Sequence, residues 1–421
     1  MTMLGLSLAY LRRRPLTTVL NLLLLALGVG VIAFLLLLER GLENRLSRDV
    51  AGIDMVVGAK GSPLQLVLSA VMQVDVPTGN IPLSALAELR RNPMVRQAVP
   101  VAMGDSFGSF RILGTEPDYI AHYGGRLTRG RMFVAPMEAV LGAEAASASR
   151  LEPGDALVGS HGLTAGGEAH AGMPYKVVGI LAPTGTVLDR LVLTPVASVW
   201  AVHEHHHHHD DEADEDHDHH DHETGADQGH GHDAAGEEGE HREVTAILVR
   251  YAAPLAAARL PREINRETEM QAASPAAEML RLRALLGVGL DAMRLLGLVL
   301  VLAAGLSTFV ALANALQERR HDLAIMRALG AGRLRVMAQI LTEALLVATG
   351  GMLLGVALAH AAIALLSVLS ARARDLGLSA GYVVAGEAWL LLLALLVALL
   401  AAALPSIQAY RTDVSRLLAK G

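Results

Sequence analysis

Four long apolar runs constrain the fold of this chain more than any other feature. They are Leu20–Leu38, Leu295–Leu316, a stretch within Ile340–Leu369, and Ala388–Leu404, which is followed by Pro405. An α-helix of about 17 to 25 apolar residues is long enough to cross a hydrocarbon core of roughly 30 Å. We therefore predict an integral membrane protein with four transmembrane α-helices in a 1 + 3 arrangement, the last of them ending at Pro405. No small-residue cleavage site follows the first run, which favours an uncleaved span over a signal peptide.

The composition agrees with a membrane protein, since 52% of the residues are hydrophobic and only 18% are charged. The formal net charge of −7 is a local feature. Residues 203–241 hold 15 acidic residues and no Lys or Arg, and the remainder has a net charge of +8. Basic residues are scattered or lie beside the apolar runs, so we expect no nucleic-acid partner. The sequence contains no cysteine, so any metal site in it must use His, carboxylate or backbone oxygen.

The basic residues beside the runs indicate the topology. Eleven Lys and Arg residues lie on the side that holds both termini and the loop at 317–335, against eight on the other side. Because Lys and Arg are enriched in cytoplasmic loops, we expect both termini and this loop to be cytoplasmic. The chain is then a multi-pass protein of a bacterial inner (cytoplasmic) membrane, with residues 40–290 in the periplasm.

Residues 40–290 are predicted to form a large extracytoplasmic α+β domain between the first and second helices. Short β-rich segments bounded by Gly and Pro, such as YKVVGILAP and RLVLTP, predict strands. Leu83–Pro93 and residues 256–267 are predicted to be helices. ASVWAV and EVTAILVRY, on either side of 203–241, are predicted to be strands of one sheet. VVGAKGSPLQ (Val56–Gln65) lacks the spacing of a phosphate loop and is predicted to be a turn.

These predictions divide the chain into three parts. Residues 1–39 hold an amphipathic N-terminal helix and the first span, residues 40–290 the extracytoplasmic domain, and residues 291–421 the other three spans. Residues 39–50 and 276–294 extend the first two spans in helical register. We interpret these extensions as a two-helix stalk between membrane and domain, with ordinary juxtamembrane helices as the alternative.

Residues 203–241 are a His/Asp/Glu-rich segment inside this domain. They include almost no apolar residue that would form a core, so we predict a disordered surface loop. Zinc prefers imidazole and carboxylate where thiolates are absent. We therefore expect the loop to bind Zn²⁺, with Cu²⁺ and Ni²⁺ as alternatives; a solvated spacer is the alternative for its biological role. The candidate ligands are His203, His205, His206, His207, His208, His209, His217, His219, His220, His222, His230, His232 and His241.

A short basic motif lies in the loop between the second and third spans. In ERRHDLAIMRALGAGRLRVMAQILTEALL, apolar residues such as Leu323 and Met326 share one helical face among arginines. This pattern is typical of a helix that docks into a groove of a partner protein, or that lies on an anionic membrane surface. The motif resembles the signature of the FtsX-like permease family, which includes MacB-type and LolC/LolE-type proteins. The 1 + 3 layout, the large domain after the first span and the segment PSIQAYRTDVSRLL extend the resemblance over most of the chain.

The resemblance implies a permease subunit of an ABC transporter and not an enzyme. It implies a MacB-like periplasmic domain at 40–290, an FtsX-like permease domain at 291–421 and a coupling helix at 318–333 that contacts the ATPase. No ATPase motif occurs in the sequence, so ATP is expected on a separate cytosolic ATPase subunit. The implied ATPase-contacting residues are Glu318, Arg319, Arg320, Leu323, Ile325, Met326, Arg327, Ala328, Leu329 and Gly330.

The resemblance also implies partners and a mode of action. A second permease chain, identical or different, would complete the complex. ATP-driven motion would pass to the periplasmic domain (mechanotransmission), which exports or releases an envelope client. We expect a zinc-linked form of this activity, and a periplasmic metal-binding protein is a further candidate partner.

Two alternative functions stay open. Glu343 and His360 are intramembrane polar residues, a kind that often marks a functional site. A zinc transporter with a path between the spans would use them, but two ionisable residues provide few ligands for such a path. The other alternative is a non-transporting FtsX-like signalling protein that activates a periplasmic cell-wall hydrolase.

Overall fold

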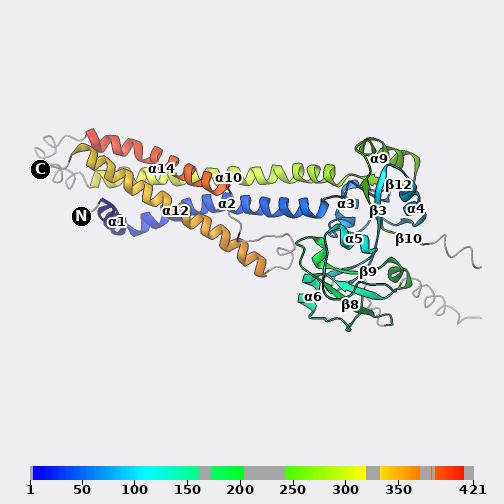
Figure 1. The fold of residues 1–421 in the computed structure, drawn as a ribbon. Coiled ribbons are helices and arrows are strands. Elements are labelled where there is room, and N and C mark those ends of the chain that lie inside the picture. The colour runs from blue at the N-terminus through cyan, green and yellow to red at the C-terminus, as the bar shows by residue number, and fades with distance from the viewer. Residues whose placement is uncertain are drawn as a thin grey trace, which may run out of the picture. The chain divides into compact units, whose positions relative to one another are not determined.

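The computed structural model describes residues 3–160, 172–202, 242–318, 332–369, 381 and 385–411. It divides into two compact units (Figure 1). We call Met1–Asn44 with Ala284–Gly421 the membrane unit, and Arg45–Arg283 the globular unit. Among the residues described, four helices are long and apolar enough to cross a membrane, and the α+β globular unit falls between the first and second of them in the sequence. The predicted fold class is confirmed.

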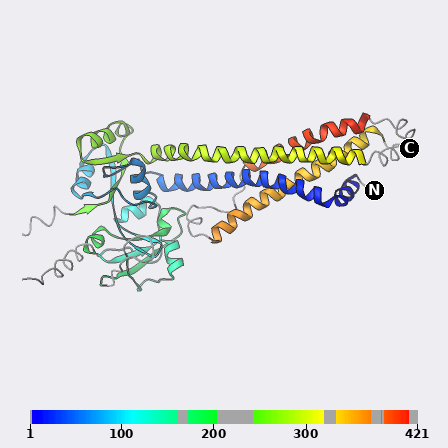
Figure 2. The same ribbon diagram turned by 180° about the vertical axis from the view of Figure 1, so that it is seen from behind.

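The membrane unit is built from long helices that lie side by side (Figures 1 and 2). One apolar cluster joins the four candidate spans and includes Val29, Val301, Ala348 and Ala394, each almost fully buried. The helices are α1 (Met3–Arg13), α2 (Pro15–Val50), α10 (Pro275–Glu318), α12 (Arg333–Leu369) and α14 (Gly386–Arg411). Both α2 and α10 continue without a break through the residues predicted to be a stalk.

Glycines allow α2 to approach its neighbours closely. A Cβ atom on Gly355 of α12 would lie 2.6 Å from the carbonyl oxygen of Ala26, and one on Gly28 would lie 2.9 Å from the amide nitrogen of Val301. Small residues at such positions let helix backbones meet where the lipid supplies no hydrophobic driving force for association. The contact of α2 with α10 and α12 therefore depends on these side chains being absent.

The prediction that Pro405 ends the last helix is wrong. Helix α14 continues through Pro405 to Arg411. Proline removes one backbone donor, but membrane helices tolerate it where nearby hydroxyl groups bond to the backbone. The hydroxyl of the next residue, Ser406, donates to the carbonyl of Ala402 at 2.6 Å.

The described residues of the globular unit are organised around a ten-stranded mixed sheet. Its order is β12-β1-β11-β3-β4-β9-β6-β8-β5, with β7 paired to β8, and β10 and β2 form a separate pair. The pairs β4·β9 and β6·β8 are parallel. The strands are β1 (Met55–Ala59), β2 (Ile81–Pro82), β3 (Val95–Phe107), β4 (Phe110–Thr115), β5 (Leu127–Gly130), β6 (Glu138–Leu141), β7 (Ala156–Leu157), β8 (Tyr175–Leu181), β9 (Leu191–Pro195), β10 (Glu243–Val244), β11 (Ala246–Tyr251) and β12 (Met270–Ala273).

Strand β1 is buried on both faces of this sheet. Val56 packs into one apolar cluster, and its neighbours Met55 and Val57 pack into another. Side chains alternate between the faces of a strand, so the two clusters lie on opposite sides of β1. The helical segments are α3 (Pro63–Ala70), α4 (Ser84–Arg91), α5 (Pro117–His122), α6 (Ala143–Ser149), the 3₁₀ helix η1 (Val187–Arg190) and α9 (Ala256–Glu267).

Two local predictions for this unit are wrong. The segment VVGAKGSPLQ is not a turn as a whole: it contains most of β1, and the Ser62 side chain caps the start of α3. The segment ASVWAV is helical, because residues 196–202 form a helix and not a strand. The buried hydroxyl of Ser198 holds this helix in place by accepting from Met137 N at 2.9 Å and from Thr194 Oγ1 at 2.7 Å.

The close approach of α2 and α12 makes a testable prediction. The substitution Gly355→Ala places a Cβ against the backbone of Ala26, and we expect it to cost about 1–3 kcal/mol of stability. Gly289→Ala in α10 is the matched control, since nothing lies within 4 Å of its added Cβ. Alanine there should be neutral or favourable by up to ~1 kcal/mol. Thermal unfolding in detergent measures both variants, and equal shifts would contradict the packing described.

Candidate functional site

Two long helices are joined to two neighbouring strands at one place in the globular unit. Helix α2 ends at Val50 and β1 begins at Met55, while β12 ends at Ala273 and α10 begins at Pro275. Strands β1 and β12 pair antiparallel, with Val56 opposite Ala273. The end of α2 and the start of α10 are therefore connected by short linkers to paired strands. We call this region, residues 45–55 with 273–283, the joint.

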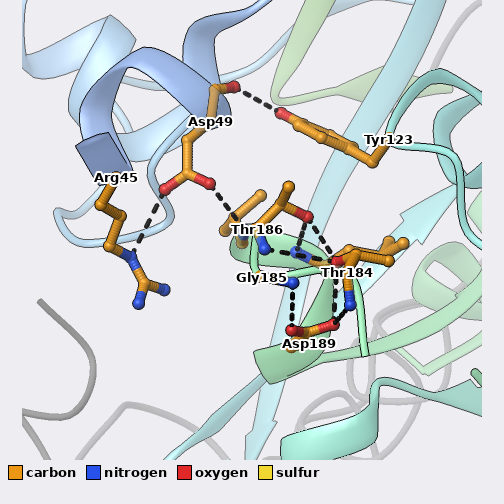
Figure 3. A network of polar contacts seen from close by, with 9 residues as sticks. Arg45, Asp49, Tyr123, Thr184, Gly185, Thr186 and Asp189 are labelled. Atoms are coloured by element: carbon orange, nitrogen blue, oxygen red, sulfur yellow. Dashed lines mark hydrogen bonds and ion pairs between the residues drawn. The ribbon is translucent and has the colours of Figure 1, made fainter. Parts of the chain in front are cut away.

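Asp49 fixes the last turn of α2 to the rest of the globular unit (Figure 3). Its carboxylate is 2% exposed, and its Oδ1 accepts a hydrogen bond from Val187 N at 2.8 Å. Its Oδ2 lies 3.5 Å from Nε of Arg45, one turn earlier in the same helix. A buried carboxylate costs free energy unless it is hydrogen-bonded or paired, and Asp49 is both. The contact therefore specifies one position for the helix end.

The segment that supplies Val187 N is itself held by a second carboxylate. Asp189 Oδ1 accepts from the backbone nitrogen and the hydroxyl of Thr184, both at 2.8 Å, and its Oδ2 accepts from Gly185 N at 2.7 Å. Thr186 Oγ1 accepts from Leu188 N at the start of η1. Figure 3 shows this turn facing Asp49. The donor for Asp49 is thus held in place before the helix end meets it.

Two side chains at the end of α5 bond to the carbonyl groups at the end of α2. The Tyr123 hydroxyl donates to the Asp49 carbonyl at 2.9 Å, and His122 Nε2–H donates to the Ala51 carbonyl at 3.0 Å. The last carbonyls of a helix have no partner within the helix, so these bonds act as a C-terminal cap. The next residue, Gly52, has φ +78°, which favours glycine, and an added Cβ would lie 3.0 Å from His122 Cε1.

Burial lowers the pKa of His122 below its usual value, and the charge of Arg250 lowers it further, while the hydrogen bond to Ala51 opposes both effects. The neutral imidazole is therefore the form that the joint favours.

Asp54 bonds the linker between α2 and β1 to the neighbouring strand β11. Its backbone nitrogen donates to the Val249 carbonyl at 3.0 Å, and its Oδ2 accepts from Tyr251 N at 2.7 Å.

Apolar packing supports these polar contacts. Leu46 and Val50 of α2 and Met279 of α10 all pack against the apolar cluster that covers one face of the sheet. Both helices thus contact the same core at the joint. This arrangement provides no nucleophile or acid–base pair in the part of the chain described; what it provides is a firm attachment of two helices to one sheet.

Sequence reasoning predicted a stalk but missed the joint. Its contacts link residues as far apart as Asp49 and Val187, and no local pattern indicates such pairs. The sequence did contain one signal for β1. The apolar run IDMVVGA directly follows the end of a helix, and such a run is compatible with a buried strand.

The two intramembrane residues predicted from the sequence lie apart. Glu343 is 4% exposed, and its Oε1 accepts from Gln339 Nε2 at 3.4 Å. His360 Nε2 lies 3.2 Å from Oε1 of Glu387 at the start of α14. At a rise of 1.5 Å per residue, Glu343 and His360 are separated by roughly 25 Å along α12. The structure does not bring them into one site.

The other predicted site residues fall largely outside the residues described. Of the implied ATPase contacts, Glu318 is described: it ends α10 and forms an ion pair with Arg14. Residues 319–331 and residues 203–241, with all the histidines predicted to bind zinc, lie outside the described residues. Among the residues described, no group of three His, Cys, Asp or Glu is placed to hold a metal ion.

The two flanks of the 203–241 segment contact each other. Trp200 Nε1 donates to the carbonyl of Glu243 at 2.7 Å, and the Arg242 guanidinium lies 5.2 Å from the centre of the Trp200 ring. Val202 is buried. The residues that flank the 203–241 segment are therefore held together by contacts that do not involve the segment itself.

Comparisons with known proteins agree with the architecture. The family model of the MacB-like periplasmic core domain matches residues 18–266, and that of the FtsX-like permease C-terminal domain matches residues 294–414. No curated protein matches the sequence. Among solved structures, the chain is similar to the periplasmic region of MacB from Actinobacillus actinomycetemcomitans, with 13% identity, 58% of this chain and 98% of that chain covered, and a TM-score of 0.35. It is also similar to the extracellular domain of the noncanonic ABC-type transporter YknZ from Gram-positive bacteria, with 12% identity, 52% and 98% covered, and a TM-score of 0.29.

The His122 cap predicts a pH dependence. A histidine whose pKa is lowered by folding stabilises the folded protein above the unfolded value of about 6.5, and this contribution is lost as the pH falls through and below that value. We expect the thermal stability of the full chain to fall between pH 7 and pH 5 more steeply than that of the His122→Gln variant. Melting curves of both proteins across this range provide the measurement. Parallel pH profiles would show that His122 is not the titrating group.

Proposed function

Because this chain belongs to the FtsX-like permease family of ABC transporters, with a MacB-like periplasmic core domain, we propose that it couples ATP hydrolysis by a separate cytosolic ATPase to movements of its globular unit. Members of this family generally work with a cytosolic ABC ATPase. The observation that carries the proposal is the joint: α2 is followed by β1, α10 is preceded by β12, and these two strands pair. A change in the relation between these helices would act directly on the sheet.

The joint is suited to transmitting force because it combines polar and apolar contacts. Asp49 and the two α5 side chains resist sliding of the helix end, and the packing of Leu46 and Val50 resists its separation from the core. A packed core has low compressibility and passes on strain. Movement of α2 would therefore displace β1 and the strands paired with it, and would not be absorbed in a flexible linker.

The complete proposed complex contains two permease chains and the ATPase, in a bacterial inner membrane. Both termini and residues 319–331 would be cytoplasmic, with the globular unit in the periplasm acting on an envelope client. A metal path between the spans has less support, because Glu343 and His360 lie on different turns of α12 with separate partners. Mechanical action on a client accounts for the joint, which a conduction path would not require.

We further propose that residues 203–241 link this activity to zinc. The support is the density of imidazole and carboxylate groups, 13 histidines and 15 acidic residues in one segment, which suits Zn²⁺ in the absence of thiolates. Its negative charge also attracts cations before coordination. Trp200 and Glu243 hold the two ends of the segment together, which supports a role for the segment in binding metal and not in forming the sheet.

The role of the joint is tested by loosening it. Inserting Gly-Ser-Gly between Ala51 and Gly52 separates the helix end from β1, and we expect at least a tenfold loss of ATP-driven movement of the globular unit, while ATPase binding is kept. The movement is followed by a fluorophore on Ser147→Cys, an exposed position in a chain without native cysteine.

The matched control for that experiment carries the same insertion after Gly108 in the β3–β4 turn, where nothing lies within 4 Å of the Cβ position. It should move like the parent. An unchanged signal from the Ala51 insertion would refute transmission through the joint, and a parent that shows no ATP-driven change would refute the proposed function itself.

We expect that the His-rich segment can be removed without disturbing the fold of the rest of the protein. Replacing residues 203–241 with a short Gly-Ser linker should leave the melting temperature and ATPase coupling unchanged, because Trp200 and Glu243 hold the two flanks together. High-capacity zinc binding, measured by calorimetry, should disappear. A variant that fails to fold would contradict the independence of the segment, and one that still binds as much zinc would contradict the assignment of the ligands.

A further inference from the structure

Helix α1 is held against the membrane unit mainly by polar contacts. Among residues 5–13, the Ser7 side chain is the one that is buried, while Leu6 and Leu11 are half-buried and Leu8 is 46% exposed. Elements with few buried apolar contacts open at low free-energy cost. The docking of α1 therefore depends on a small number of specific bonds.

The central bond joins α1 to α12. Gln339 Nε2 donates to Ser7 Oγ at 2.7 Å and lies 3.4 Å from Glu343 Oε1. All three side chains are less than a tenth exposed. A buried amide that loses its partner is costly, so this contact sets one docked position for α1.

A second set of contacts lies where α1 turns into α2. Arg14, in this turn, forms an ion pair with Glu318, the last residue of α10. The Thr18 hydroxyl donates to the Leu11 carbonyl at 3.1 Å and closes the turn between the two helices. The segment from Ser7 to Arg14 thus contacts the end of α10 and the beginning of α12, the two helices on either side of residues 319–331.

A cavity of about 50 Å³, lined by both polar and apolar groups, lies behind this segment. Its lining includes Tyr10, Arg14, Asn21, Thr308 and Glu343, which come from α1, the turn, α2, α10 and α12. A cavity of this size with several polar groups has room for water. The cavity leaves space beside α1, and water in it would bond to its polar groups when α1 shifts.

From these contacts we propose that α1 is a latch between the ends of α10 and α12 and the start of α2. This inference rests on the proposed coupling function. When the ends of α10 and α12 move relative to each other, the Ser7–Gln339 and Arg14–Glu318 contacts exchange or break. The turn at Arg14 then carries the displacement into α2, which leads to the joint. Ser7 and Gln339 are positioning residues in this scheme, since they act through α1.

A reversible cross-link tests the latch, because the chain has no native cysteine. The double variant Ser7→Cys with Gln339→Cys, treated in membranes with a short bis-methanethiosulfonate reagent while the ATPase is bound, should be bridged through two reducible disulfides that hold α1 docked. We expect at least a tenfold fall in the ATP-driven movement reported by a label on the globular unit that is attached without a thiol, with recovery after reduction. ATPase association should be unchanged.

Two controls separate the latch from other effects. The double variant before cross-linking is the reference for the fall, and Leu8→Cys alone, at an exposed position on α1, should behave like the parent under the same treatment. Ser106→Cys with Ser160→Cys cross-links a β-bridge inside the globular unit and should also leave the movement intact.

Two results would overturn the latch. They are full movement with the bridge between positions 7 and 339 in place, and a fall that reduction does not reverse. The proposed function is judged separately, since it fails only if the reduced parent itself shows no ATP-driven movement.

Discussion

The pairing of β1 with β12 is the constraint on which the rest of this structure depends. One strand follows α2 and the other precedes α10, so two segments more than 200 residues apart in the sequence meet in one ladder. Because β1 also pairs with β11 and is buried on both faces, it cannot shift register without moving its side chains to the wrong face. A displacement of α2 that moves β1 would therefore also move the strands in the middle of the sheet.

The two ends of the proposed transmission route are stabilised in different ways. At the joint, Asp49 is bonded within a buried network and backed by the apolar packing of Leu46 and Val50. At α1, Ser7 is bonded to Gln339 while the neighbouring Leu6 is half-buried and Leu8 is 46% exposed. Apolar burial scales with area, whereas a hydrogen bond is exchangeable at a modest net free energy. A route that is firm at the sheet and releasable at α1 is what cyclic transmission of force requires.

Sequence reasoning recovered the membrane architecture because span length and composition are local properties. It missed β1 because glycines at 58 and 61 resemble a turn. Gly58 in fact lets α3 pack closely on the strand, since a Cβ there would lie 2.4 Å from Leu66 Cδ1. It mistook residues 196–202 for a strand because the alternation of apolar residues fits either form, and the bonds of Ser198 to distant residues decide for a helix. The joint was beyond prediction for the same reason: Val187 and His122 reach α2 only through the tertiary fold.

The position of the His-rich segment in the chain restricts how zinc would act in the proposed function. The segment leaves from the helix at 196–202 and returns at β10, while the joint is built from the ends of α2, α10, β1 and β12, and α5 and η1 contact it. Its flanks are tied by Trp200 to Glu243, so a local change between them has no need to alter the strand pairing. Neutralising 15 acidic residues with bound cations would instead change the electric field around the globular unit. Zinc would then influence which partners approach the globular unit, and the mechanical route from α1 through α2 to β1 would remain as it is.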